Sequence, residues 1–178
     1  MPQTFLALAA IVLLTIFGFS QSQNSDALGR RAISEDLERA MTEAARDRMA
    51  DISRRAFDEQ DLTARGGVRT QPPTSAVGRD AGEATLAAFD DIDDFNDLAA
   101  VLGGPERRMV PVADGAVEIE LVVSVQYVRA DDPSVPSAAP TLAKEVVVSA
   151  REAAPTGGRP PVAASFRRVF TPAGLAVR

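Results

Sequence analysis

Cysteine, histidine and tryptophan are all absent from this chain of 178 residues, which also has one tyrosine and one lysine. Without cysteine and histidine there can be no disulfide bond, thiol nucleophile, imidazole base or Cys/His zinc site. The net charge of −6 argues against a nucleic-acid-binding surface. Aromatic side chains that could form a sugar-binding platform are also scarce, and we expect that this protein is not an enzyme.

Charge is also absent from Pro2 to Ser25, and the stretch from Phe5 to Phe19 is almost wholly apolar. It has the length of a signal-peptide core, but no basic residue precedes it, since the first is Arg30. A membrane span needs about 20 residues, so this one would be short. The third alternative is a helix in a filament core. We expect a retained helix whose residues in the membrane or filament core are Phe5, Leu6, Leu8, Ile11, Val12, Leu13, Leu14, Ile16, Phe17 and Phe19.

An amphipathic helix is predicted from Ser25 to Asp61. Apolar or small residues recur there every three or four positions, which is the helical period. They are Ile33, Leu37, Met41, Ala45, Met49, Ile52 and Ala56. No strong helix breaker separates this segment from the apolar one. We therefore expect one long rod, made of an apolar part (1–29) and an amphipathic continuation (30–62).

The remaining chain predicts a connecting region (63–108) and a sheet domain (109–178). Residues 64–82 are rich in Gly, Pro, Ser and Thr, as in surface loops. Residues 117–128 alternate between apolar and polar side chains, and further strands are expected at 144–151 and 162–171. Loops alone join these strands, so the sheet should be an antiparallel meander. The predicted fold class is α+β, with a long N-terminal helix packed on a small antiparallel sheet.

This order of elements resembles the type IV pilin superfamily, and three local strings support the resemblance. VSVQYV (123–128) and KEVVV (144–148) are similar to paired strand motifs of pilin-like minor subunits. DDIDDFN (90–96) is similar to an acidic segment in minor pilins of mannose-sensitive haemagglutinin-type pili. The resemblance implies a pilin-like fold and a role in a filament.

Two departures from that family are visible in the sequence. A short basic leader ending in Gly is missing ahead of the apolar segment, so we expect a mature form or a different maturation. In addition, Phe5 stands where the family has an acidic residue that pairs with a neighbouring subunit's N-terminal amine. These departures favour a minor subunit or a divergent filament over a standard major pilin.

The acidic segment is the one candidate for a chemical site. Its hard oxygen ligands, of the kind Ca²⁺ binds, come from Asp90, Asp91, Asp93, Asp94 and Asn96. The spacing does not match an EF-hand loop. The favoured alternative is a solvated turn whose carboxylates cap backbone N–H groups around a buried Phe95. No other cofactor is expected.

These patterns predict a structural subunit of an extracellular pilus-like filament, assembled through its N-terminal apolar helix. Its partners would be copies of itself or related pilin subunits. It would wait in the bacterial inner membrane and then join the filament at the cell surface, where its function is mechanical and adhesive. The alternatives are a membrane-anchored extracytoplasmic binding module and a pseudopilin of a secretion system.

Overall fold

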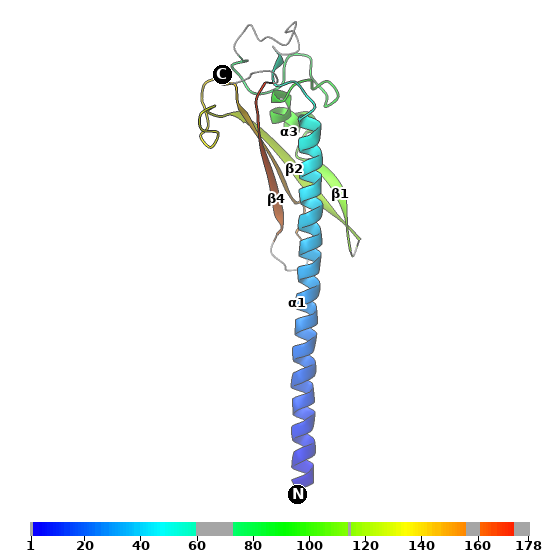
Figure 1. Ribbon diagram of the computed structural model, residues 1–178. Helices are drawn as coiled ribbons and strands as arrows, with labels where there is room; N and C mark the ends of the chain where they lie inside the picture. The colour runs from blue at the N-terminus through cyan, green and yellow to red at the C-terminus, as the bar shows by residue number, and fades with distance from the viewer. Residues whose placement is uncertain (1, 60–72, 114, 156–160, 173–178) are drawn as a thin grey trace.

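The computed structural model describes residues 2–59, 73–113, 115–155 and 161–172. In the first helix it describes side chains from residue 11 onward, apart from positions 24, 26, 27 and 30. Figure 1 shows this helix as a rod whose C-terminal half runs along a sheet and whose other end extends away from it. The elements are α1 (Pro2–Ile52), the 3₁₀ helix η2 (Asp93–Asp97), α3 (Leu98–Leu102), β1 (Glu106–Val112), β2 (Gly115–Tyr127), β3 (Lys144–Glu152) and β4 (Ala163–Phe170).

The predicted fold class is wrong in its account of the N-terminal helix. Where side chains are described, α1 contains a short segment, 11–23, which is apolar only as far as Phe19, and a longer amphipathic one, 31–52. Across the described part of the chain, no helix is long and apolar enough to cross a membrane. The physical reason is that uncharged but polar residues follow Phe19 at once, from Ser20 to Gln23. Among the described residues the long apolar helix of a pilin-like fold is therefore not found, and the fold is α1 with two short helices and an antiparallel sheet.

The C-terminal half of α1 packs against the sheet through a single apolar stripe. Its fully buried positions are spaced three or four residues apart, so they lie on one side of the helix. Most charged residues of this half are exposed, and Arg48 is the exception, because it is buried and pairs with Glu106 of β1 at 2.6 Å. The buried apolar residues of α1 are Leu37, Met41, Ala44, Ala45, Met49 and Ile52.

The sheet has four strands in the order β1-β2-β3-β4, and every pair is antiparallel. In β2, alternate residues from Ile119 to Tyr127 are buried, as the sequence alternation predicts. The first strand begins at Glu106, ahead of the predicted start of the sheet domain near Met109. The charged residues at the start of β1 interrupt the apolar–polar alternation from which a strand is predicted. The sheet accommodates them because Arg107 pairs with Glu120 on β2.

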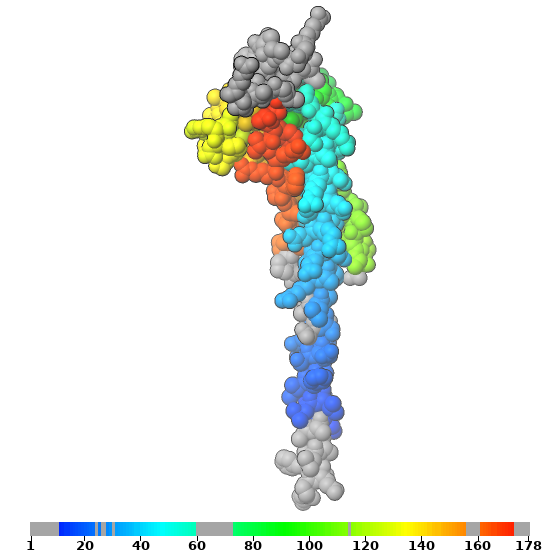
Figure 2. Space-filling model, viewed as in Figure 1, coloured from blue at the N-terminus to red at the C-terminus, as the bar shows by residue number. Residues whose placement is uncertain are grey.

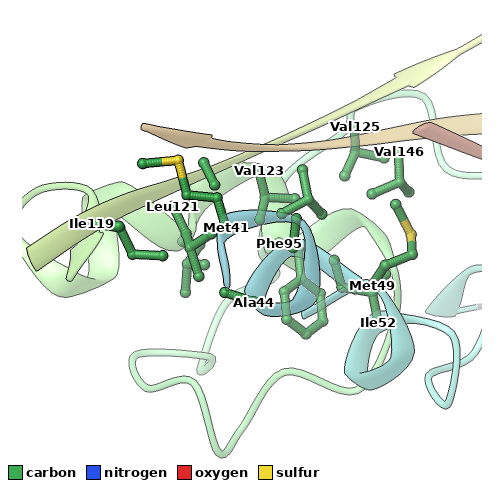
Figure 3. Packing of buried hydrophobic residues seen from close by; sticks show 14 of the residues in the cluster. Met41, Ala44, Met49, Ile52, Phe95, Ile119, Leu121, Val123, Val125 and Val146 are labelled. Carbon is green, nitrogen blue, oxygen red and sulfur yellow. The ribbon is translucent and has the colours of Figure 1, made fainter. Parts of the chain in front are cut away.

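The hydrophobic core lies between α1, the sheet and η2 (Figure 3). Phe95 from η2 is 1% exposed and meets the ring of Phe89 edge-on, with ring centroids 5.3 Å apart. Met41 and Met49 reach this core from α1. Residues far apart in the sequence thus share one apolar interior, which is expected to supply most of the stability.

Two methionines provide a matched test of this core. Met41 is completely buried, whereas Met109 on β1 is 64% exposed. Met41→Ala should lower the free energy of unfolding by about 2–5 kcal/mol, because it leaves a cavity. Met109→Ala should change it by no more than about 0.5 kcal/mol. Urea denaturation measures both, and equal effects would contradict this packing.

Candidate functional site

The most unusual group in the structure is the side chain of Lys144, which is completely buried at the start of β3. Its Nζ lies 2.6 Å from Oδ1 of Asp93 and 3.3 Å from Oδ2 of Asp58. Nζ also donates a hydrogen bond of 2.7 Å to the carbonyl oxygen of Phe57. A lysine ammonium is buried only when it is paired, and here two carboxylates and a carbonyl surround it.

Three segments distant in the sequence meet at this lysine. Asp58 follows the end of α1, Asp93 opens η2 and Lys144 opens β3. A parallel backbone bridge joins the first two segments, since the N–H of Ala56 donates to the carbonyl of Asp90 and that of Ile92 to the carbonyl of Ala56. The lysine therefore lies where the helix end, the acidic segment and the sheet converge.

A second layer of groups positions the two carboxylates. The N–H of Thr74 donates to Oδ2 of Asp58 at 3.0 Å. The hydroxyl of Thr74 lies 3.1 Å from that oxygen and 3.2 Å from Oδ2 of Asp93, and its single proton serves one of them at a time. Tyr127 in turn donates its hydroxyl proton to the carbonyl of Thr74 at 2.8 Å. The same tyrosine ring and that of Phe57 lie 5.2 and 4.5 Å from Nζ.

The acidic segment uses most of its side chains to bind backbone N–H groups. Oδ1 of Asp91 accepts from the N–H of Asp93 at 2.7 Å and, at 3.3 Å, from that of Asp94. Oδ2 of Asp94 accepts hydrogen bonds from the backbone N–H groups of Asp90 and Asp91, at 2.9 and 3.1 Å. Oδ1 of Asn96 accepts the N–H of Val125 at 3.1 Å, which fixes the segment to β2. This is the capping role that the sequence favoured, although most of these carboxylates are buried rather than solvated.

The five residues considered as calcium ligands, in the less favoured of the two alternatives, do not converge on one point. Asp91 and Asn96 bind backbone groups, and Asp93 faces Lys144. The structure instead places Glu83 beside Asp90 and Asp94. One carboxylate oxygen from each of these three residues lies within 4.8 Å of the other two oxygens. Burial raises the pKa of Glu83, and its hydrogen bond to Asp94 raises it further. Since Ca²⁺ takes six to eight oxygens, these three carboxylates alone fall short. Calcium binding stays a prediction.

Burial also raises the pKa of two carboxyl groups in the acidic segment, those of Asp91 and Asp93. It raises the pKa of Asp91 to about 7, and the charges of Asp93 and Asp94 contribute to this rise. The pKa of Asp93 is raised by burial as well, although the adjacent Lys144 opposes that change. Several carboxylates close together in an apolar interior cannot all be charged without cost.

Sequence reasoning missed Lys144, Asp58 and Thr74 as members of a site. Lys144 was predicted only as the first residue of a strand. One signal was available in the sequence. Lys144 is the only lysine of the chain, and valines follow it in the same strand. Neither Asp58 nor Thr74 stands out from the polar residues around it in the sequence.

The second predicted group, the apolar residues near the N-terminus, is exposed wherever it is described. Figure 2 shows this part of α1 as a narrow column beyond the sheet. Phe5, Leu6 and Leu8 lie outside the described side chains. The exposed fractions are Ile11 62%, Val12 48%, Leu13 67%, Leu14 71%, Ile16 61%, Phe17 69% and Phe19 67%.

The raised pKa of Asp91 predicts a loss of stability with rising pH. An unfolded aspartate titrates near 3.9, so from about pH 4 to 7 the folded chain holds a proton that the unfolded chain releases. The stabilisation that this bound proton provides is complete at about pH 4 and below, and it disappears as the pH passes about 7. The variant Asp91→Asn keeps the accepting oxygen and cannot titrate.

Relative to that variant, the wild-type free energy of unfolding should fall by up to about 1.4 kcal/mol per pH unit in this window. Urea denaturation at a series of pH values measures the difference. Parallel profiles for the two proteins would contradict the assignment.

Comparison with known proteins identifies no relative of this chain. No protein-family model, no curated protein and no solved structure matches it. A functional assignment therefore rests on the contacts and exposure of the described residues.

Proposed function

We propose that this protein is a structural subunit of an extracellular pilus-like filament, joined to other copies of the chain through residues 11–19 of α1. The observation that carries the proposal is the exposure of this segment. Every large apolar side chain from Ile11 to Phe19 is between 48 and 71% exposed.

The segment is apolar around its whole circumference. At 3.6 residues per turn, consecutive apolar residues point in every direction rather than forming one stripe. A helix that is apolar on all sides is normally buried within a protein, an assembly or a membrane. One partner helix covers only one side, so several neighbours are needed to remove the segment from water.

Burial of this surface would drive association. Each square ångström of apolar surface removed from water contributes roughly 25 cal/mol. Copies that meet through different surfaces extend without closing, and such heterologous packing produces helical filaments. The sheet and the acidic segment lie at the opposite end of the molecule from this segment, so neighbouring copies could pack there without obstruction from them (Figure 1).

The proposal assigns an interface and no catalytic step. In this scheme the subunit waits in the bacterial inner membrane and is then incorporated into the filament. Its rivals are a monomeric membrane-anchored binding module and a secretion-system pseudopilin. Electron microscopy of material sheared from the surface of producing cells separates the first rival from the proposal, since a chain found only in membrane fractions would end it.

A charged residue in the segment provides a sharper test. Leu13→Asp should abolish filament formation, because an unpaired carboxylate among packed apolar side chains costs several kcal/mol. The matched control is Met109→Asp, which places the same charge at an exposed apolar position on β1. The control should assemble normally. Filaments of normal length and number from Leu13→Asp would contradict the proposed interface.

A further inference from the structure

Lys144, Asp93 and Asp58 form a sealed group of one amine and two carboxyls. The exposed fraction of the side chain is 0% for Lys144 and Asp58 and 3% for Asp93. The amine nitrogen is 2.6 Å from one oxygen of Asp93 and 3.3 Å from one oxygen of Asp58. Such a group can be a simple ion pair, but it also contains every atom needed for an amide bond.

The ion pair of Lys144 and Asp93 is short, at 2.6 Å, and it opposes the rise in the pKa of Asp93. Nζ donates hydrogen bonds to the Phe57 carbonyl and to Asp58, whereas its approach to Oδ1 of Asp93 does not have the angles of a hydrogen bond. Since a carbon–oxygen double bond is about 1.23 Å long, Nζ is within about 3.9 Å of the Asp93 carboxyl carbon. That is close to the separation of about 3–3.5 Å from which bonds form.

We propose that Lys144 and Asp93 become joined by an isopeptide bond, formed within the folded chain, with Asp58 as the group that relays protons. This is an intramolecular modification, and it does not depend on the proposed role in a filament.

The reaction needs no co-reactant. A proton first passes from the Lys144 ammonium to the Asp93 carboxylate by way of Asp58, which leaves a neutral amine facing a neutral carboxyl. The lone pair of Nζ attacks the carboxyl carbon, and the C–N bond forms. Asp58 then takes a proton from nitrogen and delivers it to the departing oxygen. One carbon–oxygen bond breaks, and one water molecule leaves.

The surroundings favour the product over the ion pair. Rings of Phe57 and Tyr127 cover the nitrogen, so the charged forms are poorly solvated. A neutral amide removes both charges from the interior. The side chains of Lys144 and Asp58 are 0% exposed, so the bulk water that would drive the reverse reaction does not reach the group. Thr74 lies between the two carboxyls and keeps Asp58 oriented.

The bond would fix the acidic segment to the sheet. It would link the start of η2 to the start of β3, two elements far apart in the sequence. A cross-link of this kind restricts the unfolded chain and resists extension by force.

The intact mass of the purified full-length protein tests the proposal. The wild type should weigh less than its sequence mass by one water molecule. Trypsin should then yield one branched species, in which residues 80–107 are joined to residues 130–151 and cleavage after Lys144 is blocked. A wild-type protein at its full sequence mass overturns the proposal, whether or not any variant folds.

Variants identify the atoms involved. Lys144→Arg and Asp93→Ala should have their full sequence masses, and so should Asp58→Ala, which lacks the proton relay. Asp93→Asn should lose one ammonia molecule instead of water, because the amide nitrogen is then the leaving group. Loss of water that persists in Lys144→Arg or in Asp93→Ala overturns the assignment, since it would come from another reaction such as succinimide formation.

Discussion

The burial of Lys144 between two carboxylates is the constraint on which the rest of the domain depends. Removing an ammonium from water is costly unless partners surround it, and here the partners come from separate parts of the chain. Asp58 follows α1 and Asp93 opens η2, so the helix end and the acidic segment must both reach the start of β3. The acidic segment is therefore part of the structural framework, and its remaining carboxylates hold the turn through backbone N–H groups.

The two halves of α1 meet different demands. From Leu37 to Ile52 the apolar stripe is covered by the sheet and by Phe95. From Ile11 to Phe19 the apolar side chains are exposed all round. A single apolar stripe needs one covering surface, whereas an all-round apolar helix needs several. This contrast is why the C-terminal half of α1 belongs to the fold of the domain and the N-terminal half is assigned to the proposed assembly.

Local patterns predicted those parts of the fold that local physics determines. The strands β2 and β3 show alternation or an apolar run, and the amphipathic part of α1 shows the helical period. The prediction of a long apolar helix overextended an apolar stretch that ends at Phe19. For the site, the sequence drew attention to the acidic segment but not to Lys144. No sequence spacing shows that residues 58, 93 and 144 meet, because only the packing of α1 on the sheet brings them together.

A double-mutant cycle between Lys144 and Asp93 tests the central claim most directly. The measured quantity is the free energy of unfolding of wild type, Lys144→Met, Asp93→Ala and the double variant. Each single change should cost about 3–5 kcal/mol, because it leaves the other buried group without the partner to which it is paired as an ion or joined as an amide. The double variant should cost less than the sum of the two by about 2 kcal/mol or more. Effects that add to within about 0.5 kcal/mol would contradict the account.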